Sequence, residues 1–118
     1  MSAAARQAVA RHFEGRADNV VATYAAILDA ARALGTFAED PKKTSIHLVR
    51  STAFAGVAVQ KAALVLTLKS DRDVDSPRIR RSEQASAHRW HIEVRLSQPK
   101  DVDRQVRSWL ARAYALAE

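Results

Sequence analysis

Cysteine is absent from this chain of 118 residues, and glycine and proline occur only three times each. Without cysteine the sequence offers no disulfide framework and no thiolate zinc site, which suits a reducing cytoplasm. It contains no phosphate-cradling P-loop, no dinucleotide-binding fingerprint and no G-x-S-x-G elbow. The sequence therefore argues against the common nucleotide-dependent enzymes and against nucleophilic hydrolases.

Long apolar runs are also missing. No segment approaches the roughly 18 consecutive apolar residues that cross a bilayer. The first ten residues are small but are interrupted by Arg6 and Gln7, so they lack the apolar stretch of a secretory signal. We therefore predict a cytoplasmic protein with no membrane partner.

Acidic residues are outnumbered, because 19 Lys and Arg face 13 Asp and Glu and give a net charge of +6. This balance favours anionic partners such as nucleic acid, nucleotides or acidic protein surfaces. The chain is also rich in Arg and Ala, so genomic base composition is an alternative source of the charge. The length fits one domain, predicted over residues 17–118, with 1–16 as an N-terminal extension or short helix.

Helical spacing of apolar side chains predicts two strong helices. The first covers residues 18–34, with Asp18 as N-cap and Gly35 just past its end. The second begins at Pro99, which presets a first turn. Its apolar stripe consists of Val102, Val106, Trp109, Leu110, Ala113 and Leu116. A shorter helix is expected over residues 2–13.

Alternation with a period of two predicts four strands. They cover Thr44–Arg50, Ala53–Gln60, Ala62–Lys69 and His88–Leu96. The side chains assigned to the core are Ile46, Leu48, Ala55, Val57, Val59, Leu64, Leu66, Leu68, Trp90, Ile92, Val94 and Leu96. Residues 70–85 are expected to form a long irregular loop. Short connections favour antiparallel pairing, so the predicted fold is α+β: a four-stranded antiparallel sheet with N-terminal and C-terminal helices on one face, in two layers.

Several short motifs carry a family resemblance through their order and spacing. They are His12-Phe13-Glu14-Gly15, Pro41-Lys42-Lys43-Thr44, Phe54-Ala55, Leu64–Leu68, Asp75-Ser76-Pro77-Arg78, His88 with Val94-Arg95-Leu96, and Ala113-Tyr114. Together they resemble the domain of unknown function 5655 family of bacteria. The closing strand and helix also resemble, more distantly, the YjbR-like double-wing group, which implies predicted DNA binding. The first resemblance implies a fold but no activity.

Basic side chains form the main candidate binding site, an outward sheet face with adjoining loops that would contact phosphates. Its members are Lys42, Lys43, His47, Arg50, Arg78, Arg80, Arg81, His91 and Arg95. The alternative is a solvated face that serves solubility. The aspartates at 71, 73 and 75 favour that alternative, since they could pair with the loop arginines.

Aromatic residues offer no stacking platform, because Trp90 and Trp109 fall on apolar sides and are assigned to the core. Phe54 is predicted to face outward beside Val49 and Val65, giving an apolar patch suited to a homodimer or a small ligand. A single β-bulge in this strand would reverse that assignment.

Metal binding is a weak interpretation. His88 and His91 point to opposite faces of their strand, while His47 and His91 would meet only on neighbouring strands, and beyond Glu93 no third ligand is evident. The Glu39-Asp40-Pro41-Lys42 segment loosely resembles a nuclease pattern, but Pro41 is expected to interrupt the strand that such a site needs. No catalytic residue, metal or cofactor is predicted.

The leading hypothesis is a small non-catalytic binding module that contacts an anionic partner such as nucleic acid. The alternative is a ligand-sensing or enzymatic domain, with a pocket between the sheet and the 70–85 loop that uses His47 or His91.

Overall fold

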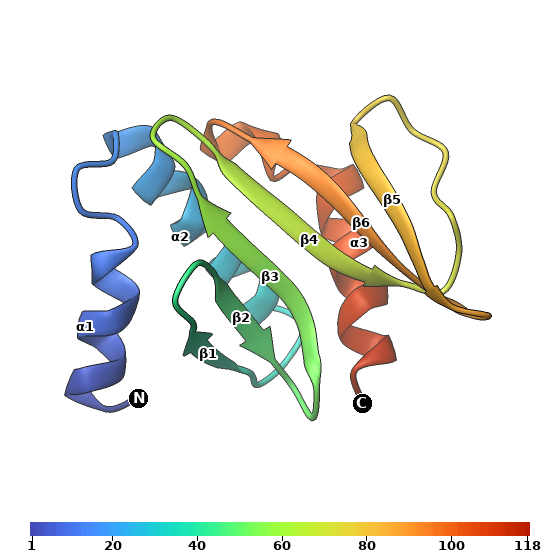
Figure 1. Ribbon diagram of the computed structural model, residues 1–118, viewed down its shortest axis with the longest axis horizontal. Helices are drawn as coiled ribbons and strands as arrows, with labels where there is room; N and C mark the ends of the chain where they lie inside the picture. Colours follow the sequence, from blue (N-terminus) through green and yellow to red (C-terminus); the bar gives the residue numbers. More distant parts are fainter.

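The computed structural model describes all 118 residues and contains three α-helices and a six-stranded antiparallel sheet (Figure 1). The helices are α1 (Ala3–Arg11), α2 (Asp18–Arg32) and α3 (Arg104–Leu116), with a 3-10 turn, η1 (Pro99–Asp101), before α3. The strands are β1 (Ala38–Pro41), β2 (Ile46–Val49), β3 (Ala53–Val59), β4 (Leu64–Ser70), β5 (Ile79–Ser86) and β6 (Arg89–Leu96). Their order in the sheet is β1-β2-β3-β4-β6-β5.

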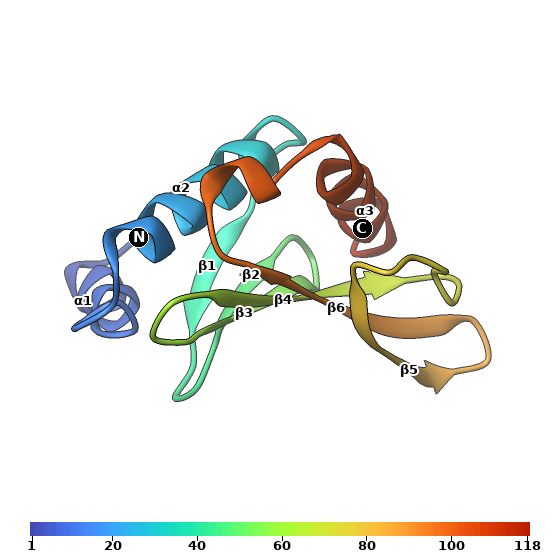
Figure 2. The same cartoon turned by 90° about the horizontal axis from the view of Figure 1, so that it is seen from above.

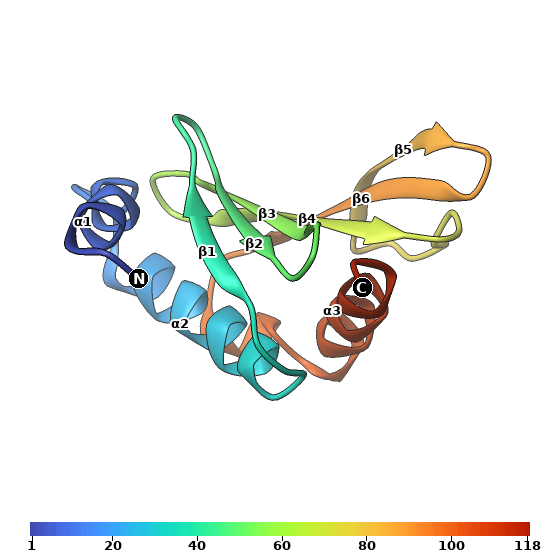
Figure 3. The ribbon, with the colours of Figure 1, turned by 90° about the horizontal axis from the view of Figure 1, so that it is seen from below.

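Two layers make up the fold, because α2 and α3 lie on one side of the sheet (Figures 2 and 3). We call the covered side the inner face and the opposite side the outer face. The α+β class and the helices on one face of an antiparallel sheet are confirmed. None of the helices combines the length and the apolarity needed to span a membrane.

The predicted number of four strands is wrong, because two edge strands were not recognised. Strand β5 begins at Ile79, so it replaces the second part of the expected 70–85 loop, and it pairs with β6. All its residues after Ile79 are exposed, so no apolar alternation marks it. Strand β1 pairs with β2 from Ala38 to Pro41. Pro41 ends this strand instead of interrupting it, which an edge position tolerates because the missing N–H costs no ladder bond there.

The core lies between the inner face and the two long helices. It takes alternate residues of β2, β4 and β6, as predicted, together with the apolar stripes of α2 and α3. Ile46, Leu64, Leu66 and Leu96 are all fully buried.

Phe54 is the main correction within the core, since it points inward and only 1% of it is exposed. The register between β2 and β3 shifts at Leu48 and Val49, which pair with Ala55 and Ala53, so Phe54 is the extra residue of a bulge. Its ring packs edge-on against Phe37 and Tyr114, with centroids 6.0 and 5.2 Å away. Because Val65 is also buried, the exposed apolar patch predicted around Val49, Phe54 and Val65 does not exist.

The N-cap of helix α2 lies one residue earlier than predicted. Ala17 is the N-cap and makes no side-chain bond, while Asp18 is the first helical residue. Past the end of α2, Gly35 has φ +149°, and a Cβ there would collide with the hydroxyl oxygen of Tyr114. The absent side chain lets the Tyr114 hydroxyl donate to the Thr36 carbonyl at 2.8 Å.

The C-terminal helix begins later than predicted, because Pro99 starts only the single turn η1. Helix α3 starts at Arg104, after its N-cap Asp103. Trp109 is half-buried against the core, as its stripe predicts. Trp90 is also half-buried but lies outside the core cluster, between Ser70 and Gln84 on neighbouring strands, so its assignment to the core is wrong.

Candidate functional site

The outer face carries a hollow of about 280 Å³ over the middle of the sheet. His47 of β2, Lys69 of β4 and His91 of β6 line it, with the hydroxyls of Ser45 and Thr67. Strand β3 crosses the hollow between the two histidines. The residues that line it thus come from four strands and include three nitrogen-bearing side chains.

Small residues on β3 create the hollow, because Gly56 and Ala58 leave space where larger side chains would stand. Gly56 sits directly between His47 and Thr67 in the register of the sheet. A Cβ at Gly56 would contact only the His47 Cδ2, at 3.7 Å. A larger side chain at this position would therefore occupy the hollow without disturbing the backbone.

Lys69 supplies a positive charge to the hollow that no carboxylate neutralises. Its ammonium group donates to the hydroxyl oxygen of Thr52 at 3.0 Å, and it directly faces His91 across the β4–β6 pair. Lys69 is not among the predicted site residues, although its outward position in the third predicted strand follows from the same alternation that places Leu68 inward.

Arg95 is exposed on the outer face opposite Val65, and no carboxylate lies within ion-pair distance of it. Together with His47 and His91, it occupies the outward position that the sequence predicts. Lys69 and Arg95 are thus two cations on the same uncovered face, and each lacks an acidic partner. A phosphate group that approaches Lys69 or Arg95 would therefore not have to displace a carboxylate from either side chain.

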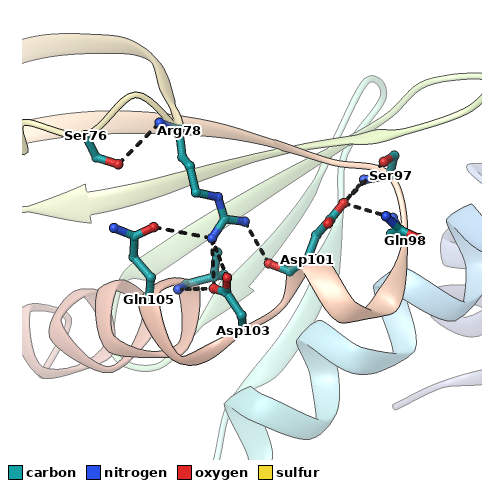
Figure 4. A network of polar contacts seen from close by, with 8 residues as sticks. Ser76, Arg78, Ser97, Gln98, Asp101, Asp103 and Gln105 are labelled. Atoms are coloured by element: carbon teal, nitrogen blue, oxygen red, sulfur yellow. Dashed lines mark hydrogen bonds and ion pairs between the residues drawn. The ribbon is translucent and has the colours of Figure 1, made fainter.

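Arg78 belongs to a different part of the molecule, where it joins the long loop to the start of α3 (Figure 4). Its Nη1 donates to both carboxylate oxygens of Asp103 at 2.8 Å, and its Nη2 donates to the Asp101 carbonyl at 2.9 Å. Only 28% of its side chain is exposed. These bonds show that Arg78 stabilises the fold, so it is not part of the candidate site on the outer face.

Two aspartates complete this network. The backbone N–H of Val106 and the Arg78 guanidinium hold the pKa of Asp103 below its ordinary value. Partial burial raises the pKa of Asp101, but bonds from Ser97 and Gln98 outweigh it and leave that pKa lowered as well. Both carboxylates therefore stay charged, Asp101 where it accepts bonds at the start of η1, and Asp103 where it caps α3 and pairs with Arg78.

Arg50 is also structural. Its guanidinium lies 4.2 Å from the centre of the Tyr114 ring and donates to the Tyr114 carbonyl at 3.1 Å. This carbonyl, in the last turn of α3, also accepts from the backbone N–H of Ala117 at 3.2 Å, so Arg50 adds a second bond to the end of the helix. The predicted site thus loses Arg50 as well as Arg78.

Of the remaining predicted cations, Lys42, Arg80 and Arg81 form ion pairs, and Lys43 is exposed. Lys42 pairs with Asp40 at 2.8 Å, and Lys43 is exposed in the β1–β2 turn. Arg80 and Arg81 approach Glu93 at 3.9 and 4.0 Å. Arg81 also pairs with Glu83 at 2.6 Å. The arginines of β5 are therefore balanced by nearby glutamates.

The loop aspartates do not pair with these arginines, contrary to the prediction. Asp71 contacts Arg72 and Arg112, at 3.2 and 3.4 Å. Asp73 accepts from the Ser82 hydroxyl at 2.6 Å. The charges on Arg78, Arg80 and Arg81 are instead balanced by residues of β5, β6 and α3.

The two outward histidines do not form a metal site, because β3 and β4 separate their strands. Three strand spacings and an offset of two residues along the strands place their backbones roughly 16 Å apart. No group of three His, Asp or Glu side chains is arranged to hold a metal ion. The hollow that holds both histidines is lined by β2, β3, β4 and β6, and no residue of the 70–85 segment contributes to it, contrary to the predicted pocket.

The nuclease-like segment is likewise divided, because Glu39 and Asp40 are adjacent on β1 and point to opposite faces. Glu39 accepts from the Tyr24 hydroxyl at 2.5 Å on the inner side. Burial, together with this bond to Glu39, raises the pKa of Tyr24. Glu39 thus stabilises the packing of β1 on α2 and has no acidic neighbour with which to bind a cation.

Comparison with known proteins gives one match. The family described as Domain of unknown function (DUF5655) matches residues 9–117. No curated protein and no solved structure matches the chain. The more distant YjbR-like resemblance stays a prediction.

Proposed function

We propose that this chain, which belongs to the DUF5655 family, is a non-catalytic module that binds the phosphate backbone of nucleic acid. The family description assigns no activity, so the proposal is based on the geometry of the outer face. The observation that carries this proposal is the gathering of Lys69, His47 and His91 around one hollow on an uncovered sheet face. Arg95 stands on the same face. Lys69 and Arg95 have no acidic partner, so both charges remain for a ligand.

Phosphate is favoured over bases as the group recognised. No Phe, Tyr or Trp side chain stands on the outer face, and readers of single strands use such rings to stack bases. Lysine and arginine contact phosphate oxygens regardless of sequence. The hydroxyls of Ser45 and Thr67 add hydrogen-bond donors beside the charges. The module therefore binds without strong base preference.

A salt titration of binding tests this proposal. Fluorescence anisotropy would follow short labelled single-stranded and double-stranded oligonucleotides, from roughly 50 to 200 mM salt. Affinity should fall steeply with salt, and Lys69→Ala or Arg95→Ala should each reduce the slope of log K against log salt by about 1. Binding that does not respond to salt would contradict the proposal.

Matched controls come from the opposite side of the molecule. Lys100 of η1 and Arg107 of α3 are exposed, so Lys100→Ala and Arg107→Ala remove the same charges without touching the outer face. Both should retain the slope of the unaltered protein. An equal loss in controls and test variants would mean that net charge, and not this face, binds the oligonucleotide.

The hollow itself supports a second candidate function. Its volume of about 280 Å³ is close to that of small ligand pockets, which begin at about 300 Å³. A nucleoside monophosphate is therefore the informative competitor. If it displaces the oligonucleotide with similar affinity, the domain senses a small phosphorylated ligand; if it does not, the extended backbone is the ligand. Gly56→Val, which fills the hollow, should reduce the affinity for the small ligand more than the affinity for the oligonucleotide.

A further inference from the structure

The two edges of the sheet are protected to different degrees. Strand β1 has four residues, ends at Pro41 and packs beside α1. Strand β5 has eight residues and no proline, and its free edge borders no other strand. Unpaired strand edges bind further strands unless they are short, covered or blocked. Of the two, β5 is therefore the edge on which another strand can pair.

The backbone of β5 has unpaired N–H donors and C=O acceptors along its free edge. Residues 80–86 make no backbone hydrogen bond outside the sheet ladder. Between the irregularities at its two ends, Arg81 to Gln84 pair in regular register with Glu93 to Trp90 of β6. In such a run alternate residues direct their N–H and C=O groups away from the existing partner. The centre of β5 thus offers an unpaired edge in regular register.

The charges on β5 do not block pairing as a run of lysines would. Arg81 and Glu83 lie on the same face, two residues apart, with Ser82 between them. Arg80, Arg81, Glu83 and Glu93 together give two positive and two negative charges, hence no net charge, in this cluster. An antiparallel copy centred on Ser82 would place each Arg81 opposite a Glu83.

We propose that β5 pairs with β5 of a second copy of this chain, antiparallel and with the two-fold axis at Ser82. Two ion pairs between Arg81 and Glu83, one on each side of the axis, set the register. Such an axis is perpendicular to the sheet, so both outer faces lie on the same side of one continuous sheet. This inference rests on the edge and its charges and is independent of the nucleic-acid proposal.

Sedimentation equilibrium of the full chain, without nucleic acid, tests the pairing. The unaltered protein should show a monomer–dimer equilibrium. Arg81→Glu and Glu83→Arg should each raise the dimer dissociation constant at least about tenfold, because each change creates two like-charged contacts by symmetry. The double exchange R81E/E83R should restore it to within a few fold. Arg107→Glu on α3 makes the same charge change away from β5 and should have no effect.

A protein that remains monomeric up to about millimolar concentration, where even weak complexes form, would overturn the proposal. A dimer indifferent to Arg81→Glu would overturn it as well. Amide hydrogen exchange supplies the second measurement, because dimerisation through β5 should slow exchange at outward amides of residues 81–84 as concentration rises. Protection that appears elsewhere and not on β5 would assign the dimer to another surface. Circular dichroism of each variant verifies that it folds.

Discussion

The inner and outer sides of the sheet use their charged residues in opposite ways. On the helix side, Arg78 and Arg50 are tied to carboxylates, carbonyls or rings at the two ends of α3. On the outer face, Lys69 and Arg95 have no acidic partner, and the small residues of β3 leave a hollow beside them. Similar side chains therefore hold the fold on one side and have no acidic partner on the other.

This difference separates most residues of the family resemblance from those of the candidate site, although Arg95 belongs to both sets. Phe54 contacts Tyr114, and the imidazole Nε2 of His12 is 2.9 Å from the Lys42 carbonyl oxygen. Both contacts join elements distant in sequence. Several motifs that identify the family thus stabilise its fold, while Lys69, Gly56 and His47 lie outside those motifs.

The largest contrast between the two sides should come from removing Phe54. Phe54→Ala empties a fully buried ring position between Phe37 and Tyr114, and we expect a loss of about 3–5 kcal/mol in the free energy of unfolding. Thr67→Ala on the outer face should change it by less than about 0.5 kcal/mol. Urea denaturation of both variants measures the difference. Similar values for the two would remove the distinction between the sides.

Arg78→Ala should have the next largest effect. It removes hydrogen bonds to the Asp103 carboxylate and the Asp101 carbonyl, and charge-assisted bonds of this kind contribute about 1.5–3 kcal/mol. We expect a loss of about 2 kcal/mol by denaturation, with nucleic-acid binding reduced no more than in Arg107→Ala. A stable Arg78→Ala variant that no longer binds would place Arg78 in the site instead.

Acid should weaken the same network. Because the pKa values of Asp101 and Asp103 are lower in the folded than in the unfolded protein, their stabilisation is complete above about pH 5 and is lost as pH falls through the lowered values. Asn caps a helix as well as Asp does, so Asp103→Asn keeps the bond from Val106 but loses the negative charge that faces Arg78, and it should cost up to about 1 kcal/mol at pH 7. Denaturation at a series of pH values should show this cost shrinking towards zero below pH 3. A cost independent of pH would contradict the assignment.

The smallest effect on stability should come from the outer cations. Lys69→Ala and Arg95→Ala remove exposed or half-exposed charges without acidic partners, so each should change the free energy of unfolding by less than about 0.5 kcal/mol. The same denaturation assay measures it. A loss above 1 kcal/mol would show that these residues serve the fold, as Arg78 does.

Much of the fold follows from periodicity alone. The two long helices and the strands β2, β3, β4 and β6 each bury one side, and burial of one side is what creates a detectable period. Strand β5 is exposed on both sides and β1 spans four residues, so neither has a period to read. Phe54 was misplaced because a bulge shifts the phase by one residue, and the alternation around it gives no sign of the shift.

The candidate site was predictable only in part. Alternation correctly directs His47, His91 and Arg95 outward, and it applies equally to Lys69. The partners of Arg50 and Arg78 lie 64 and 25 residues away in the chain, so no local pattern distinguishes these arginines from free ones. Nor does the sequence reveal the hollow, which depends on placing Gly56 beside His47 and Thr67 across three strands.

Amide chemical shifts during titration with a short oligonucleotide give the most direct test of the different roles of the two faces. The outer face should respond, with the largest changes in β2, β4 and β6 around His47, Lys69 and His91, while α2 and α3 remain unchanged. Changes confined to the helices, or spread evenly over all exposed basic residues, would contradict the account.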